Sequence, residues 1–589
     1  MMLQTLNNLK KDYQDKIEIR KKKTWLLSYS RLFSFGLSLL FWILYFCNNF
    51  NLIFLILGIV FLVSFVVLVI IHHYVDKYII NLNNKITLID RYISRYTDEW
   101  KKEDYKLDDK IKLTNLTTDL DIISSSSCLL KYLDFTCSKG GRDLLINNLK
   151  LEDVNKQDII LKQDAIKELV DNKEFVLDFI TSYSSIDNVH NIDFKEYFSL
   201  FDKPKKKYHI VFFIISIILS LLSIASLVLW IVNVLNYIPF VVMVLIQLIY
   251  SYFYSRNYAE EFNIINKSAR VYKELKNVYN IDLPSFNSEL NKEFKEYLLK
   301  GKNILKYIVK LGDIVTFKYN IVTSILLNVF ASLNFVIIFM YQNLLKNKAD
   351  DFIKSISLLE KEEYLISLTT IPLVKENLTI PLINDSVNLT IKNGYHPLIE
   401  ETICVGNDFE TGKDVNIITG SNMSGKTSFM KMVALNLVLA LNGSYVNCQE
   451  FNFPIAKIFT SINVKDDITN GISTFYGELS RIKDCIDYLN ENPSKLVIVF
   501  IDEIFKGTNY QDRIYGAKEV VNKLSSLNVI TFLTTHDFEL CEINNQLIKN
   551  YHFEENYIDD QISFDYKIKN DITHSTNARY LMKKMKIID

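Results

Sequence analysis

The sequence predicts three kinds of structure in one chain: an α/β domain of the P-loop type at the C-terminus, an all-α helical core upstream, and two transmembrane helical hairpins. Three observations lead to this fold class. Two long apolar blocks lie in the first half of the chain, and the charged segments around them have a helical pattern. After about residue 371, short β-branched runs alternate with helical segments, as in a parallel, doubly wound sheet.

The first apolar block runs from Leu32 to Ile71 and is interrupted only around Asn49. The second extends from His209 to about Tyr254, with a break near Asn236. Each half approaches the roughly 20 residues that a helix needs to cross the hydrocarbon core. A cleaved signal peptide does not fit, because the first block makes two passes and is too long. A soluble hairpin is disfavoured because the second block opens with a run that has no polar face.

Charge predicts how the hairpins are oriented. Basic residues precede each hairpin, whereas neither turn carries Lys or Arg. The basic residues are Lys21, Lys22, Lys23 and Arg31 before the first hairpin, and Lys203, Lys205, Lys206 and Lys207 before the second. Positive-inside bias therefore predicts a multi-pass protein of the cell membrane, with four transmembrane helices and its C-terminal domain in the cytoplasm.

A third apolar stretch, from Ile314 to Met340, carries Lys318 and three asparagines. A fifth crossing here would move the C-terminal domain to the outside of the cell, so an even number of crossings is the consistent solution. We therefore expect this stretch to be a buried or membrane-surface helix.

These patterns predict six segments: a basic cytoplasmic N-terminus (1–31), hairpin 1 (32–73), a first helical-core segment (74–207), hairpin 2 (208–254), a second helical-core segment (255–370) and the C-terminal α/β domain (371–589). The formal net charge of −1 gives no global case for nucleic-acid binding. The seven cysteines are far apart and include no C-x-x-C, so a reducing environment without a zinc or disulfide framework is expected.

The residues from Gly420 to Thr427 satisfy G-x-x-x-x-G-K-[ST] between a predicted strand and a predicted helix. In such a loop, glycines let backbone amides surround phosphates, the helix N-terminus adds positive potential, and Lys426 reaches the β- and γ-phosphates. The Thr427 hydroxyl is expected to bind Mg²⁺. The predicted ATP-binding residues of this loop are Gly420, Ser421, Asn422, Met423, Ser424, Gly425, Lys426, Thr427 and Ser428.

Two acids follow the strongly apolar strand that begins at Leu496. Asp502 is expected to hold the Mg²⁺ shell and Glu503 to polarise the attacking water. His536 ends the next predicted strand, where the carboxyl ends of parallel strands form a ligand crevice. The predicted catalytic residues are therefore Glu503, His536 and Lys426, and the predicted metal ligands are Thr427 and Asp502.

Several ordered blocks in the last 200 residues resemble the MutS mismatch-repair family. Thr419 to Thr427 is close to that family's T-G-P-N-M-G-G-K-S, and Asp502 to Asn509 resembles D-E-I-G-R-G-T-S. Further similar blocks are Gly394–Pro397 (G-R-H-P), Phe459–Thr460 with Asp466–Glu478, Thr534–Leu540 (A-T-H-Y-F-E-L) and Tyr551–Phe553. Weaker matches at residues 133–142 and 163–169 look like the start of the family's helical core.

This resemblance implies a homodimer of ATPase domains, in which Ser473 and Thr474 of one subunit complete the phosphate site of the other. It also places His396 among the nucleotide-binding residues. Serine and threonine here would equally well cap a helix in a monomer. An ABC transporter subunit shares the loop, the acids and the histidine, but no L-S-G-G-Q-like stretch precedes Leu496.

The family's mismatch-reading domain has no counterpart before the first hairpin, so we expect no mismatch specificity, while DNA binding through the backbone remains open. The sequence thus predicts a membrane-anchored MutS-like ATPase that hydrolyses ATP with Mg²⁺ at a dimer interface, coupled to DNA binding or repair. The alternative is a transport, remodelling or regulatory ATPase of the membrane. No charged residue lies inside the apolar hairpins to mark a transport path.

Overall fold

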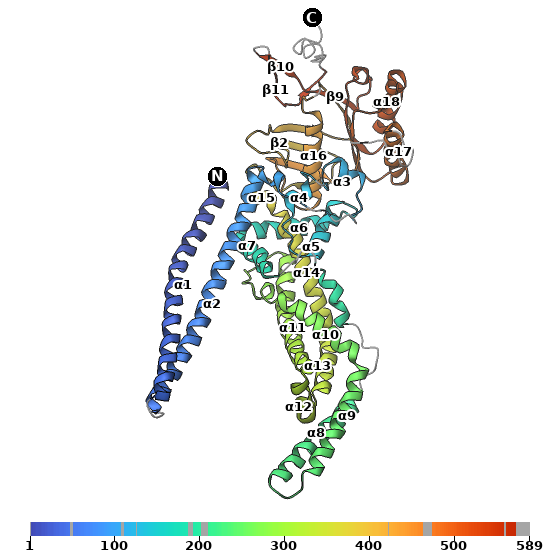
Figure 1. The fold of residues 1–589 in the computed structure, drawn as a ribbon. Helices are drawn as coiled ribbons and strands as arrows, with labels where there is room; N and C mark the ends of the chain where they lie inside the picture. Colours follow the sequence, from blue (N-terminus) through green and yellow to red (C-terminus); the bar gives the residue numbers. More distant parts are fainter. Residues whose placement is uncertain are drawn as a thin grey trace. The chain divides into compact units, whose positions relative to one another are not determined.

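The computed structural model describes residues 2–47, 51–105, 107, 111–124, 126–186, 192–201, 210–421, 423–462, 464, 474–558 and 561–572. The protein has a mixed α/β fold with many helices (Figure 1). The chain divides into two compact units that are each discontinuous in sequence. The first contains Met1–Leu133, Leu149–Gln163 and Leu368–Asp589, and the second contains Asp134–Asn148 and Asp164–Ser367.

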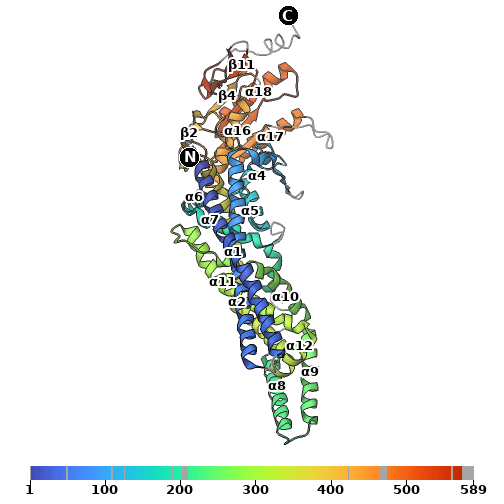
Figure 2. The same ribbon diagram turned by 60° about the vertical axis from the view of Figure 1, so that its left-hand side comes forward.

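The first unit opens with two long helices, α1 (Met2–Cys47) and α2 (Leu52–Tyr96), which pack side by side (Figures 1 and 2). With 46 and 45 residues they extend well beyond the apolar block that predicted a hairpin. At 1.5 Å per residue each is about 68 Å long, more than twice the roughly 30 Å of a hydrocarbon core. The polar halves form a paired stalk, in which Lys10 and Asp90 lie 2.6 Å apart.

Short elements join this stalk to the α/β part of the first unit. They are η1 (Glu99–Lys102), α3 (Asn115–Asp119), α4 (Leu129–Leu133) and α15 (Thr370–Val374). Arg95, buried in the last turn of α2, donates to the carbonyl oxygens of Tyr132 (3.2 Å) and Lys131 (3.2 Å). The guanidinium therefore fixes the end of α2 to α4.

The α/β part contains a six-stranded sheet in the order β12-β9-β4-β8-β7-β6. All neighbouring strands are parallel except the edge pair β12–β9. The strands are β4 (Val415–Thr419), β6 (Lys457–Ser461), β7 (Val497–Asp502), β8 (Val529–Thr534), β9 (Ile548–His552) and β12 (Lys569–Asn570). The helices between them are α16 (Lys426–Leu441), α17 (Thr474–Glu491) and α18 (Tyr510–Ser525). The predicted parallel sheet is thus present, and its central strands are buried on both faces because helices flank them.

A second sheet of four strands, in the order β1-β5-β2-β3, lies in the same unit. Its strands are β1 (Leu382–Asn384), β2 (Leu389–Gly394), β3 (Asn407–Thr411) and β5 (Glu450–Pro454). A small antiparallel pair, β10 (Glu555–Ile558) and β11 (Gln561–Phe564), follows β9.

The second unit is all helical in the described residues. It contains α5 (Lys139–Leu149), α6 (Lys156–Asp171), α7 (Lys173–Ser182), η2 (Tyr183–Ser185), η4 (Phe194–Phe201), α8 (Ile210–Ile231), α9 (Ile238–Asn257), α10 (Ala259–Glu274), η5 (Val278–Asn280), α11 (Glu289–Tyr319), α12 (Ile321–Ala331), α13 (Leu333–Asn347) and α14 (Ala349–Leu368). The first residues of α6 belong to the first unit, as does the end of α5. Of the described helices, α1, α2, α8 and α9 are long and apolar enough to cross a membrane, and the bent pair α11–α12 would add a fifth if it formed one span.

The stretch from Ile314 to Met340 differs from the single helix expected for it. The chain bends by 110° between α11 and α12, and a second break separates α12 from α13. Asn320 causes the first break, because its side chain caps α12 by accepting from the Thr323 amide at 3.2 Å. Ser332, in the left-handed region at φ 50°, makes the second break.

Candidate functional site

The loop between β4 and α16 has the geometry of a phosphate-binding turn. Gly420 (φ 143°) and Gly425 (φ 107°) adopt backbone conformations that side chains disfavour. A Cβ atom on Gly420 would also lie 2.9 Å from the carbonyl oxygen of Phe553. The loop therefore needs glycine at both positions, and it delivers the chain directly into the N-terminus of α16.

Lys426 is buried and its Nζ donates to the carbonyl oxygens of Gly420 (2.7 Å) and Ser421 (2.9 Å). Burial lowers the pKa of Lys426, although the nearby carboxylates of Glu503 and Asp502 oppose this effect. Among the described residues, the hydrogen-bond partners of this ammonium group are thus neutral carbonyls, and an anionic ligand would be a stronger partner.

Two serines of the loop face different surroundings. Ser424 Oγ is buried and makes no hydrogen bond to any described residue, so it is available to a ligand in the loop. Ser421 Oγ instead donates to Glu555 Oε2 at 2.5 Å. Met423 is exposed with φ 71°, and Asn422 lies outside the described residues.

Asp502, at the end of β7, receives hydrogen bonds from two neighbouring elements. Thr427 Oγ1 on α16 lies 3.1 Å from Asp502 Oδ2, and Thr534 Oγ1 at the end of β8 donates to Oδ1. The parallel register pairs Asp502 with Thr534, which explains why the two meet at this edge of the sheet. The predicted metal ligands Thr427 and Asp502 are therefore adjacent, and both offer the oxygen atoms that Mg²⁺ prefers.

Glu503 follows with φ 54°, a conformation fixed by hydrogen bonds from its amide to the carbonyl and hydroxyl oxygens of Thr534 (3.0 and 3.1 Å). Its carboxylate lies 3.2 Å from His536 Nε2 and 3.0 Å from Lys506 Nζ. The hydrogen bond with His536, followed by that with Lys506, lowers the pKa of Glu503 to about 2. The predicted base Glu503 is thus ionised, and each of its two carboxylate oxygens contacts a different partner.

The start of α17 packs against the segment that follows Glu503. Glu478 Oε2 accepts from the Phe505 amide at 2.6 Å, and the rings of Phe475 and Phe505 meet edge to face at 5.4 Å. Burial raises the pKa of Glu478 above its ordinary value. Thr474 is the first residue of α17, whereas Ser473 lies outside the described residues.

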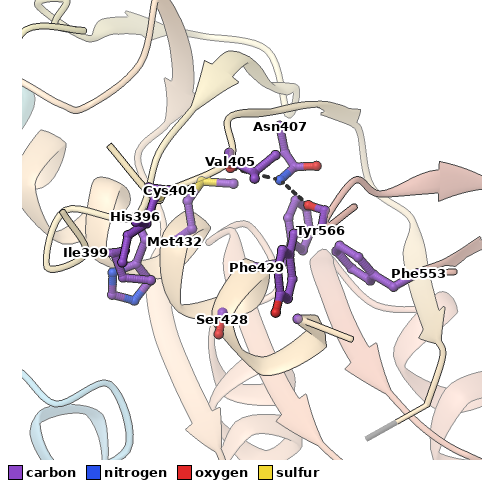
Figure 3. A pocket seen from close by; sticks show the side chains of 12 residues that line it. His396, Ile399, Cys404, Val405, Asn407, Ser428, Phe429, Met432, Phe553 and Tyr566 are labelled. Atoms are coloured by element: carbon purple, nitrogen blue, oxygen red, sulfur yellow. Dashed lines mark hydrogen bonds between the residues drawn. The ribbon is translucent and has the colours of Figure 1, made fainter. Parts of the chain in front are cut away.

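A cavity of about 350 Å³ lies beside the N-terminus of α16 (Figure 3). Its walls are largely apolar and aromatic, with a few polar groups. They are formed by His396, Ile399, Ile403, Cys404, Val405, Asn407, Gly425, Ser428, Phe429, Met432, Phe553 and Tyr566. Because Gly425 and Ser428 belong to both the cavity wall and the start of α16, the cavity opens next to the phosphate-binding turn.

His396, for which nucleotide binding was predicted, lies in the wall of this cavity. Burial, followed by the nearby ammonium groups of Lys431 and Lys375, lowers the pKa of His396 to about 3, so its imidazole is neutral. Asn407 was not predicted. Its amide donates to the carbonyl oxygen of Tyr566 at 3.0 Å and accepts from the Ile568 amide at 2.9 Å, which holds the C-terminal strand segment against β3.

These features define the class: an α/β domain that can bind a phosphorylated ligand between a glycine turn, a helix N-terminus and acids at the ends of parallel strands. The family-model comparison agrees, since a model of MutS domain V matches residues 416–585. The C-terminal domain of this chain is therefore similar to domain V of the MutS family.

Individual relatives point to the same region. MutS protein homolog 4 of Mus musculus is 36% identical over 203 residues, which is 32% of this chain and 21% of that protein. The DNA mismatch repair protein MutS of Aquifex pyrophilus is 32% identical over 221 residues, 36% of this chain and 25% of that protein. That of Staphylococcus haemolyticus is 31% identical over 205 residues, 33% and 23% of the two chains. The match thus spans no more than about a quarter of these curated relatives.

Proposed function

We propose that this chain is a membrane-anchored MutS-like ATPase that binds ATP with Mg²⁺ in the turn before α16 and hydrolyses it. The observation that carries the proposal is the meeting of Thr427, Asp502, Glu503 and His536 at one edge of the sheet, beside Lys426. The similarity to DNA mismatch repair proteins supports ATP binding and hydrolysis, because the matched region contains all these residues.

The loop suits a triphosphate. Lys426 Nζ would exchange its carbonyl contacts for phosphate oxygens, and the unpartnered Ser424 hydroxyl would donate to the same group. Thr427 and Asp502 would hold Mg²⁺, which supplies charge neutralisation on the β- and γ-phosphates. Thr534 keeps the Asp502 carboxylate oriented toward Thr427.

Glu503 is the residue suited to orient and accept a proton from the attacking water, because its carboxylate is ionised and is held at the end of β7. Both oxygens are engaged in the described arrangement, by His536 and by Lys506. Activation therefore requires one of these contacts to open. His536 is exposed on its other side, where it would meet the γ-phosphate.

The cavity of Figure 3 is suited to the adenine base. A purine buries its faces well between apolar and aromatic side chains, and Phe429, Phe553 and Tyr566 supply these next to the phosphate turn. The neutral His396 adds a polar group that does not repel a base edge.

Dimerisation belongs to the proposal. Ser473 and Thr474 of a second subunit would close the site over the γ-phosphate, as in the dimer that the resemblance to the MutS family implies. Glu478 and the Phe475–Phe505 contact link α17 to the Glu503 segment of the same subunit. When α17 of one subunit closes the site of the other, the movement would therefore also act on Glu503 of the subunit to which that α17 belongs.

Membrane anchoring rests on α1, α2, α8 and α9, whose apolar side chains are largely exposed, with the α/β domain on the cytoplasmic side.

The residues of the nucleotide site are suited to ATP turnover whether that turnover drives a change in DNA or in the membrane. One observation favours work on the membrane as the second candidate function. The α3–α4 connector, which Arg95 ties to the stalk, also forms ion pairs with the helices around the site: Asp119 with Arg481 of α17 at 2.7 Å, and Asp121 with Lys431 of α16.

ATP turnover of the full chain in nanodiscs, with and without duplex and branched DNA at two salt concentrations, tests the proposal. We expect Lys426→Ala to abolish ATP binding, while the exposed Lys523→Ala binds like wild type. Glu503→Ala should bind ATP but lose at least ~100-fold in turnover, the usual contribution of a positioned base. Failure of wild type to bind ATP would refute the proposal. DNA stimulation that weakens steeply with salt would assign the DNA role, and lipid-sensitive turnover without it the membrane role.

A further inference from the structure

We propose that the α11–α12–α13 segment is a re-entrant membrane element: it dips into the hydrocarbon core beside α8 and α9 and returns to the side from which it entered. The inference rests on the proposed membrane anchoring by α8 and α9. It concerns the second unit alone, in which α12 packs directly against both α8 and α9 (Figures 1 and 2).

The segment is apolar but too short to cross. No charged residue lies between Lys318 and Lys346. The chain nevertheless turns by 110° at Asn320 and breaks again at Ser332, so that α12 has 11 residues and spans only about 16 Å. A crossing helix needs about 20 residues, so this geometry fits entry and return.

One face of α12 is exposed and purely aliphatic. It comprises Ile321, Val322, Ile325 and Leu326, which are 77%, 66%, 45% and 52% exposed. Their spacing places them on one side of the helix in its first two turns, whereas Asn328 and Val329 in its last turn are buried. This face continues the exposed apolar surfaces of the α8 and α9 helices on which α12 packs, so the occupant that it fits is the acyl chains of the same bilayer.

The C-terminal end of α12 and its cap are held to the hairpin by a buried cluster of neutral polar groups. Ser332 Oγ bonds to the hydroxyls of Ser216 (2.9 Å) and Ser220 (2.8 Å) of α8. Gln247 of α9 donates to the carbonyl oxygen of Asn328 at 2.9 Å. Each of these side chains is less than 5% exposed.

A second set of contacts extends the cluster. Ser251 donates to Asn328 Oδ1 at 2.7 Å and accepts from Asn334 Nδ2 at 2.8 Å. The backbone polar groups at the break between α12 and α13 also have partners, since the Ser332 amide donates to the Leu327 carbonyl oxygen and the Ser332 carbonyl oxygen accepts from the Phe335 amide. Irregular backbone is tolerated in a hydrocarbon core only where such partners exist. Serine, asparagine and glutamine between helices are typical of packing inside membranes.

The position of the cluster along α8 and α9 also indicates how deep the re-entrant element lies in the hydrocarbon core. Ser220 lies ten residues after the start of α8 at Ile210, and Gln247 ten residues before the end of α9 at Asn257. At 1.5 Å per residue, Ser332 therefore lies about 15 Å from both helix ends, near the middle of a ~30 Å core. Phe339 of α13 stacks on Phe213 near the start of α8, so the chain rises again along α13.

Spin labels on the full chain in nanodiscs test this inference, in a background where Cys47 and Cys404 are serine. One label replaces Ile325 on α12, one replaces Leu221 on the exposed face of α8, and one replaces the exposed Lys306 on α11. We expect the labels at positions 325 and 221 to be accessible to oxygen and protected from a water-soluble nickel complex, and the label at 306 to show the reverse.

The outcomes separate the two proposals. Lipid exposure at 221 with water exposure at 325 would overturn the re-entrant element and leave the anchoring intact. Water exposure at both would remove the anchoring by α8 and α9 as well. Protection of 325 from both reagents, with dipolar broadening between labels, would mean that a second copy of the chain covers α12, which also overturns the inference.

Discussion

Glu362 should make the stability of this protein depend on pH, and its replacement by glutamine should remove the share of that dependence that this residue contributes. The side chain lies on α14 of the second unit and is 2% exposed. Its Oε1 makes no hydrogen bond to any described residue. Burial, followed by the charge of Glu168, raises the pKa of Glu362 from 4.5 to about 8. The folded protein therefore holds this carboxyl group protonated at neutral pH.

The sign follows from proton binding. Because the folded-state pKa lies above the unfolded value, the folded state binds more protons between the two values, and stability falls as pH rises. The contribution is fully present below about pH 4.5 and is lost above about pH 8. A pKa shift of one unit corresponds to about 1.4 kcal/mol. For the shift from 4.5 to about 8, the free energy of unfolding should therefore fall by at most ~5 kcal/mol across this pH window. Full burial means that solvent screening reduces this value little.

Glu362→Gln keeps the shape of the side chain but does not ionise. We expect the variant and wild type to have similar thermal unfolding midpoints at pH 5, and the variant to be more stable by several degrees at pH 8. Intrinsic fluorescence during heating in nanodiscs measures both. Glu274→Gln, on the exposed side of α10, is the matched control and should follow wild type at every pH. Parallel pH curves for wild type and Glu362→Gln would refute the reasoning.

Three further predictions concern the nucleotide site. Asp502→Asn should lower ATP turnover by about 100-fold and raise the Mg²⁺ concentration needed, because the carboxylate opposite Thr427 loses its charge; Mg²⁺ titrations of the rate check this. Lys506→Met should raise the pKa of Glu503, since Lys506 helps to lower it, so the acid limb of the pH–rate profile should move to higher pH; an unmoved limb would contradict the pairing. Tyr566→Ala should weaken ATP binding by about 10-fold with little change in kcat, as measured by nucleotide titration and steady-state rates, because only base contacts are lost.

The sequence could predict the centre of the site because local order determines it. A glycine turn between a β-branched run and a helix defines the strand, loop and helix around Gly420 to Thr427. An acid pair that ends an apolar strand then falls at the same edge of a parallel sheet, which brings Asp502 to Thr427.

The cavity wall could not be predicted in the same way. Tyr566 and Phe553 follow the phosphate turn by more than 100 residues, and they reach the cavity only because β9 pairs with β4 and Asn407 holds the segment after β11. Nothing in the local sequence around Tyr566 records that pairing. The length of the α1–α2 stalk was missed for a related reason, since only the apolar halves of these helices carry a membrane signal.

Polar residues in the second apolar block illustrate how chemistry and position combine. The sequence argument against transport relied on the absence of intramembrane charge, which leaves neutral polar groups without a role. The structure assigns several of these groups to helix packing: Gln247 and Ser216 turn inward toward Asn328 of the third apolar stretch, at the junction of α8, α9 and α12. Most polar groups of this cluster bond to one another between helices, although Gln247 Oε1 and Asn334 Oδ1 are buried without a partner among the described residues, and these bonds stabilise one arrangement of the helices. The residues that interrupt the apolar pattern therefore serve the packing of α8, α9 and α12.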